Sequence, residues 1–367
     1  LDRFFEQENI EIGHKDVVAI TESVVARTQG NYVTIDQVAK DLNPDFAGKE
    51  LGVILPILSR NRFAIVLRAI ASADLEKVIL QLSLPSDEVG NHLITLDQLD
   101  NAGINPWRET ISEAKYRELF GYQKHEFTGI DYVAYYKELV EDCGKKCEII
   151  FSNDPLAILA HTKYVINCDI HTRKRTKNLL LKNGAECVRS LDDIMNAPID
   201  GSGYNEKYGL LGSNKSTEDQ IKLFPRECST LVEAIQAEVK KRTGKTIEVM
   251  VYGDGAFKDP VGKIWELADP VVSPGYTSGL EGTPNELKLK YLADNDFKDL
   301  RGDELKEAIK EAIKSKSDNL VGQMATQGTT PRQLTDLLGS LCDLTSGSGD
   351  KGTPVVYIQG YFDNYTN

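Results

Sequence analysis

The sequence lacks any long hydrophobic run. No stretch approaches the roughly 18 consecutive apolar residues of a membrane-spanning helix, and the first residues resemble neither a signal peptide nor a transit peptide. The chain also lacks a basic excess: its net charge is −13 over 367 residues, which argues against nucleic acid as the main partner. We therefore expect a cytoplasmic protein that binds neither membranes nor nucleic acid.

Cysteine is scarce and scattered. There are six cysteines, and the closest two, Cys143 and Cys147, have no second pair or nearby histidine that would complete a zinc site. Reduced thiols are the expected state in a large chain without a secretion signal. Hydrophobic residues make up 41% and charged residues 27%, the balance of an ordinary globular protein, and the length suits two or three domains.

Nucleotide-binding motifs of fixed spacing are also missing. The chain has no Walker A sequence. Gly347, Gly349 and Gly352 match the dinucleotide fingerprint literally, but they precede an apolar run at 353–360 instead of following a strand and opening a helix. A loop whose backbone N–H groups hold an anion and a plain turn are equally compatible with these glycines.

Residues 129–195 contain a regular alternation of helix and strand patterns, which predicts a small parallel α/β unit. The cations at 173–177 favour a solvated helix face over an anion-binding patch. In chain order, the expected elements are a helix at 132–141, a strand at 147–151, a short helix opened by Asn153-Asp154-Pro155, a strand at 164–168, a basic helix at 172–181, a strand at 186–188 and a helix at 190–195.

The flanking regions carry fewer clear signals. Residues 62–81 are compatible with either a helix or a strand. Elsewhere we expect strands at 16–21, 246–252 and 353–360, and helices at 229–241 and 303–316.

Aspartates follow the expected strand at 246–252. Asp254 and Asp259 lie in a loop after it, and Asp200 lies in a separate Gly-rich loop. Carboxylates beyond the carboxyl end of a strand are suited to holding a divalent ion against phosphate oxygens. Loop aspartates also cap turns, and composition alone favours that simpler role.

Five short segments occur in an order typical of one enzyme family. They are residues 16–30, 196–200 (Asn-Ala-Pro-Ile-Asp), 259–266 (Asp-Pro-Val-Gly-Lys-Ile-Trp-Glu), 299–305 (Asp-Leu-x-Gly-x-Glu-Leu) and 346–360. Together they resemble the coenzyme F420-0:L-glutamate ligases, the γ-glutamyl ligases of deazaflavin biosynthesis. The resemblance covers roughly residues 1–60 and 196–360.

The resemblance implies a mixed α/β fold that pairs as a homodimer. The two-domain ligase-like core would comprise residues 1–61 and 196–367. Residues 62–195 would be an insertion that contains the small α/β domain at about 129–195.

The resemblance also implies an activity. The family uses GTP, with Mn²⁺ or Mg²⁺, to phosphorylate a substrate carboxylate, and the amine of glutamate then attacks the acyl phosphate. The expected partners are therefore a small-molecule acid, coenzyme F420-0 or a related compound, and glutamate.

Site residues follow from the matching positions. Arg27 stands where the family has Lys, and Gly203 stands where it has Asn, so that Asn205 becomes the nearest candidate. The family's Thr is missing, being Gly255 or Pro260 here. The implied nucleotide contacts are Ser23, Arg27, Asn205, Gly347, Ser348 and Gly349, and the implied metal ligands are Asp200, Asp254 and Asp259.

Alternatives remain open at this point. The same chemistry could join an amino acid to another acceptor, such as a folate or a cell-wall precursor. The lost Thr is compatible with a non-catalytic ligand-binding relative. A Rossmann-type oxidoreductase ranks third, because no fingerprint glycines follow Phe151.

Overall fold

The protein divides into two compact units, which we describe separately. Unit 1 comprises residues 1–21, 227–255 and 272–367, and unit 2 comprises residues 22–226 and 256–271. The computed structural model describes residues 7–126, 128–253, 257–258, 265–266, 273–317, 319–326, 333–346 and 354–363.

Unit 1 is built on a four-stranded sheet in the order β14-β11-β1-β15. β1 (Val17–Thr21) is parallel to β11 (Glu248–Tyr252) and antiparallel to β15 (Val355–Ile358), and β14 (Gly275–Tyr276) is antiparallel to β11. The remaining elements of the unit are α9 (Cys228–Thr243), η3 (Ser278–Leu280), α10 (Leu289–Tyr291), η4 (Leu292–Asp296), α11 (Gly302–Ser315) and α12 (Leu334–Ser346).

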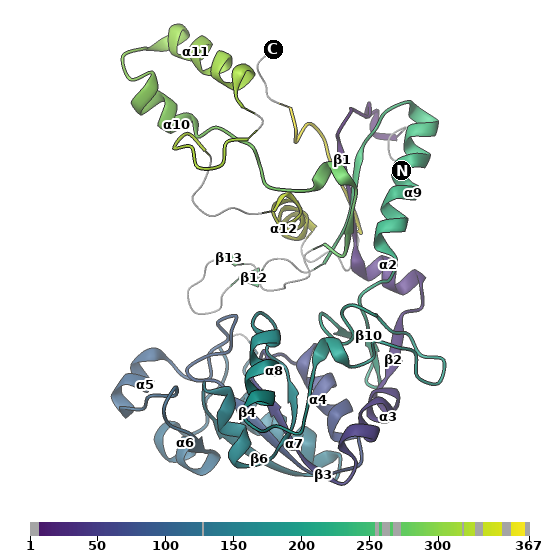
Figure 1. The fold of residues 1–367 in the computed structure, drawn as a ribbon, viewed down its shortest axis with the longest axis vertical. Coiled ribbons are helices and arrows are strands. Elements are labelled where there is room, and N and C mark those ends of the chain that lie inside the picture. Colours follow the sequence, from purple (N-terminus) through teal and green to yellow (C-terminus); the bar gives the residue numbers. More distant parts are fainter. Residues whose placement is uncertain are drawn as a thin grey trace. The chain divides into compact units, whose positions relative to one another are not determined.

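The two faces of this sheet are covered by different helices. Val17 and Ala19 alternate along β1 and pack in one core with Leu338 and Cys342 of α12. The α9 helix lies on the other side of the sheet (Figure 1). Side chains of β1 and β11 are thus buried on both faces, which explains their nearly continuous apolar sequences.

Unit 2 contains a six-stranded sheet in the order β5-β6-β4-β3-β7-β8, parallel except for β5 at the edge. Its strands are β3 (Lys49–Ile54), β4 (Leu75–Leu82), β5 (Ile111–Ser112), β6 (Lys146–Phe151), β7 (Tyr164–Asn167) and β8 (Cys187–Ser190). Its helices are α2 (Glu22–Thr28), α3 (Ile35–Phe46), α4 (Phe63–Ala71), α5 (Leu96–Ala102), α6 (Glu113–Phe120), α7 (Tyr132–Asp142), η1 (Pro155–Ala160), α8 (Arg173–Lys182) and η2 (Leu191–Asp193).

The six-stranded sheet is the middle of three layers. Leu51 and Val53 of β3 join a core formed with α3, α4 and α7, whereas Ile54 joins a second core with η1 and α8. Gly52 permits the close approach of η1, since a Cβ built there would lie 2.5 Å from Ile158 Cγ1. Helices on both faces explain why the second halves of β3, β4 and β6 are almost entirely apolar and buried.

Two smaller sheets also belong to unit 2. β2 (Tyr32–Thr34), β10 (Gln220–Lys222) and β9 (Asn214–Lys215) form an antiparallel sheet, and β12 (Phe257–Lys258) pairs with β13 (Trp265–Glu266). Among the described residues, no helix combines the length and apolar character needed to cross a membrane.

The predicted alternation of helices and strands at 129–195 is confirmed: α7, β6, η1, β7, α8 and β8 lie at the expected positions, and a short 3₁₀ turn replaces the helix expected at 190–195. The ambiguous stretch 62–81 contains both a helix, α4, and a strand, β4. The parallel sheet is larger than predicted, because β3 and β4 form its centre. That residues 62–195 are an insertion stays a prediction.

Candidate functional site

The α2 helix, which carries Ser23 and Arg27, begins directly after β1. Ser23 is partly buried and Arg27 is exposed. The start of α2 is anchored by a buried ion pair, in which Lys222 Nζ lies 2.7 Å from Glu22 Oε1 and the two side chains are 10% and 6% exposed. This pair fixes the start of α2 relative to the end of β10, because separating the two charges would leave each one buried without a partner.

The end of α2 is held by the segment that follows β10. The Gln29 side chain donates to the Arg226 carbonyl at 2.7 Å and accepts from the Arg226 amide at 2.9 Å. The fully buried Asn31 donates to the Phe224 carbonyl at 2.6 Å and accepts from the Tyr204 amide at 3.0 Å. Residues 22–34, 203–205 and 222–226 therefore form one hydrogen-bonded region of unit 2.

Asn205 lies inside this region. Its amide nitrogen donates to the carbonyls of Phe224 and Pro225, both at 3.1 Å, and its oxygen accepts from the amides of Lys207 at 3.1 Å and Tyr208 at 2.9 Å. These bonds use both donors and both acceptor positions of the side chain. They support a structural role, and the nucleotide contact predicted for Asn205 stays a prediction.

Gly203 explains the departure from the family pattern at this position. A Cβ built on Gly203 would lie 2.5 Å from Asn31 Oδ1 and 2.7 Å from the Tyr32 backbone nitrogen. The Gly203 amide also donates to the Tyr32 carbonyl at 2.8 Å. No side chain fits here unless the backbone of residue 32 moves.

Asp200 lies on the surface of unit 2 in a tight turn. Its φ of 48° is in the left-handed region, which Asp tolerates better than most residues. Its carboxylate lies 2.5 Å from Lys40 Nζ on α3, and both side chains are 60% exposed. The carboxylate raises the pKa of Lys40 above its usual value, through the hydrogen bond and the charge.

The described residues do not assemble a metal centre around Asp200. No cluster of three or more metal-ligating side chains occurs among them. Asp200 does offer one accessible, hard oxygen donor, the type that Mg²⁺ and Mn²⁺ prefer. The other predicted ligands, Asp254 and Asp259, and the predicted phosphate loop at 347–349 lie outside the described residues.

The structure adds functional candidates that the sequence reasoning missed. Glu22, Asn31 and Lys222 position the α2 region, and the Arg226 guanidinium lies 4.2 Å from the Tyr204 ring centroid, a cation–π contact. All are polar residues in short loops or at element ends. Their partners are distant in sequence, so no local pattern could have revealed them.

Comparison with protein families places the chain among the amide-forming ligases. It belongs to the F420-0:gamma-glutamyl ligase family, whose model matches residues 2–360. The matched range runs through residues 62–195 and includes both units. Searches of curated proteins and of solved structures found no significant match.

Proposed function

We propose that this protein is a GTP- and divalent-metal-dependent ligase that joins L-glutamate to coenzyme F420-0 or a closely related acid. The match of the family model to residues 2–360 carries the proposal. The mixed α/β architecture of both units supports it. By the same resemblance, we propose a homodimer, which light scattering coupled to size exclusion would test.

The proposed reaction has two steps. An oxygen of the acceptor carboxylate bonds to the γ-phosphorus of GTP, and the bond from that phosphorus to the β–γ bridging oxygen breaks, which gives an acyl phosphate and GDP. The glutamate nitrogen then bonds to the acyl carbon, phosphate leaves, and the nitrogen releases a proton. Positioning of the reactants accounts for much of the rate in such chemistry.

The residues of this chain have distinct proposed tasks. Arg27 is exposed and cationic, which suits a phosphate contact, and Ser23 lies one turn earlier on α2. The Glu22–Lys222 ion pair would hold α2 in place for both. Asp200 would supply one oxygen to a divalent ion, together with Asp254 and Asp259. When bound, such an ion offsets negative charge on the phosphates.

The first experiment is a thermal shift assay of the purified chain with GTP, ATP or neither, each with and without Mn²⁺ or Mg²⁺. A ligand at about a hundred times its dissociation constant stabilises the native state by roughly 2.7 kcal/mol, which is a readable shift. We expect stabilisation that requires both GTP and metal. No shift with any combination would argue for a non-catalytic relative.

A matched pair of variants tests Asp200. Asp200→Asn and Lys40→Met both break the same surface ion pair, but only the first removes a potential metal ligand. We expect Asp200→Asn to abolish the metal-dependent part of the GTP shift, whereas Lys40→Met retains it. Equal behaviour of the two variants would mean that Asp200 serves the surface ion pair alone.

A further inference from the structure

A second candidate site lies wholly within unit 2, and its lining includes none of the residues that the ligase proposal uses. A cavity of about 500 Å³ opens at the carboxyl ends of four strands of the six-stranded sheet. It is lined by Leu55 after β3, by residues 83–88 after β4, by Asn153 and Pro155 after β6, and by residues of 169–176 after β7. The volume suits one small molecule.

The topology of the sheet gives this position its meaning. From the central β3, the chain moves to one side through β4 and β6, and it then crosses to the other side for β7 and β8. The connections after β3 and β7 therefore leave the sheet in opposite directions. Ligands of open parallel sheets bind in the crevice outside the carboxyl ends at such a switch point. Leu55 and Asp169, from these two connections, both line the cavity.

Several amides of the connection after β3 already have hydrogen-bond acceptors. The amides of Asn61 and Arg62 donate to Ser59 Oγ, and the amide of Leu58 donates to Asp87 Oδ2. The amide of Ser59 donates to the Tyr136 hydroxyl. These four amides are thus already bonded at the place where a dinucleotide would be held in the usual way, at the helix after the first strand.

The connection after β7 behaves differently, because it already holds a carboxylate. The amides of Ile170 and His171 donate to the two oxygens of Glu88 at 2.7 and 3.1 Å, and His171 Nδ1 lies 2.7 Å from Glu88 Oε2. The Glu88 side chain is 24% exposed, and it comes from the loop after β4. The fold therefore displays a carboxylate-binding turn, occupied by a residue that lies at the rim of the cavity.

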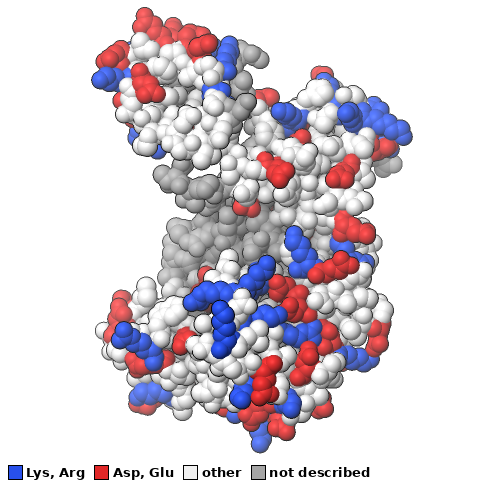
Figure 2. All heavy atoms as spheres, in the orientation of Figure 1, with Lys and Arg blue, Asp and Glu red and all other residues white. Residues whose placement is uncertain are grey.

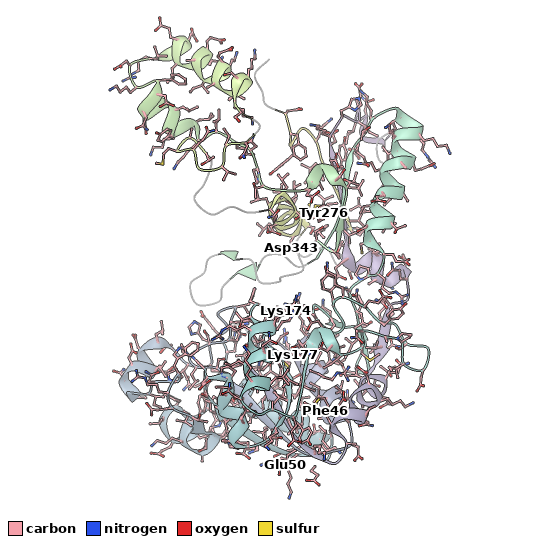
Figure 3. The ribbon with its side chains drawn as sticks, in the orientation of Figure 1. Phe46, Glu50, Lys174, Lys177, Tyr276 and Asp343 are labelled. Atoms are coloured by element: carbon pink, nitrogen blue, oxygen red, sulfur yellow. The ribbon has the colours of Figure 1, made fainter. Side chains whose placement is uncertain are left out.

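The α8 helix contributes cationic side chains near the cavity. Its first turn lies next to the cavity, where the Asp169 carboxylate already accepts from the Thr172 amide. Arg173 and Lys177 form ion pairs with Asp192 and Asp193, but the Arg175 side chain, which lines the cavity, has no ion pair or hydrogen bond among the described residues. Figure 2 shows basic side chains gathered over α8, and Figure 3 marks Lys174 and Lys177 on this helix.

The two other acids of the cavity wall are committed to the fold. Asp87 accepts hydrogen bonds from the amides of Leu58, Val89 and Asn91 and from the Asn91 side chain. Asp169 accepts from the Thr172 amide and hydroxyl and from the Thr176 hydroxyl. Of these three acids, Glu88 is the one bound by the amides of an exposed turn, where another anion could take the place of its carboxylate.

An aromatic surface completes the site. Trp107 lines the cavity and is 68% exposed, which is unusual for an indole. An exposed aromatic ring and a cationic side chain on the wall of one cavity suit a flat molecule that carries a negative charge.

We propose that this cavity binds a small planar acid, whose carboxylate or phosphate group displaces Glu88 from the turn at Ile170–His171 and pairs with Arg175, while its ring stacks on Trp107. The site does not depend on the ligase chemistry, and its test uses neither GTP nor metal. Failure of this proposal can therefore be told apart from failure of the proposed ligase function.

Tryptophan fluorescence provides the test. The chain has two tryptophans, so a Trp265→Phe chain reports on Trp107 alone. The probes are benzoate and phenyl phosphate, which distinguish the two kinds of acid, with benzyl alcohol and benzylamine as neutral and cationic analogues. We expect saturable quenching by at least one acid and none by the alcohol or the amine. Saturable binding of the alcohol or the amine alone, or no saturable quenching, would overturn the proposal.

Matched variants locate the binding. Arg175→Gln should weaken binding of the acid about tenfold or more, the usual effect of losing a charge-assisted contact. Lys182→Gln removes the same charge from the exposed far end of α8 and should leave binding unchanged. Glu88→Gln weakens the internal competitor and should tighten binding. Equal binding by Arg175→Gln and Lys182→Gln, or weaker binding by Glu88→Gln, contradicts the assignment.

Discussion

The two units place acids at opposite ends of their parallel strands. In unit 1, Asp16 and Glu248 lie at the amino ends of the paired strands β1 and β11 and are 2% and 7% exposed. In unit 2, Asp87, Glu88 and Asp169 follow the carboxyl ends of β4 and β7 and line a cavity.

The hydrogen bonds differ accordingly. Asp16 accepts from the amides of Gly13 at 2.6 Å and Gly360 at 2.9 Å and from the Tyr357 hydroxyl. Glu248 accepts from the Thr277 hydroxyl. These acids tie chain segments to the sheet, whereas Glu88 in unit 2 lies across an opening. Asp87 and Asp169 are also bonded to the fold, so Glu88 differs from the other acids because its partner is an exposed turn beside a cavity.

The largest expected effect comes from Asp16→Ala. The change leaves two amides and a tyrosine hydroxyl without their acceptor at a buried site, which should cost about 3 to 5 kcal/mol at one to a few kcal/mol per group. The rate of amide hydrogen exchange should rise in β11 of unit 1 and should stay unchanged in β3 of unit 2. A stability loss below about 1 kcal/mol would mean that water replaces these bonds.

A smaller effect should appear as a pH dependence of unit 2. Burial raises the pKa of Asp87 to about 6, against hydrogen bonds that favour the charged form. The folded state then keeps this proton to higher pH than the unfolded state, so stability falls as pH rises from about 4 to 6, by up to about 3 kcal/mol.

Asp87→Asn should remove this fall of stability with rising pH, as measured by the melting temperature across the same pH range. Asp97→Asn, the same change at an exposed site of unit 2, should retain it. Identical slopes in the parent and in Asp87→Asn would show that this group does not control the transition.

The smallest effect is expected for Glu88→Ala. Its carboxylate is partly exposed and bonds to a surface turn, so the change should cost less than about 1 kcal/mol of stability. Chemical denaturation of Glu88→Ala and Asp16→Ala would compare the two losses in the free energy of unfolding. A loss as large as that of Asp16→Ala would make Glu88 a structural acid like those of unit 1.

Local patterns predicted much of the secondary structure. Strands and helices from 132 to 190 were visible because Pro155 and Gly184 punctuate them and because their lengths are typical. The helix α4 was not distinguished from the strand β4 because nearly all of its residues are apolar and buried, as those of a central strand would also be. The strand β3 was not predicted.

Less of the candidate site than of the fold could be predicted from the sequence. The resemblance led to α2 and to Asp200, but it could not show that Lys40 pairs with Asp200 or that Asn205 is enclosed by hydrogen bonds. The cavity of unit 2 was also hidden, since its lining comes from several connections that only the folded sheet brings together.

Gly203 limits how this part of the chain can be redesigned. Its neighbours Asn31 and Tyr32 fill the space that any side chain would need. Introducing Asn, the residue that the resemblance places here, would therefore require a change in the backbone around residue 32 as well. The two segments can be altered only together, so residue 203 is a poor target for single substitutions.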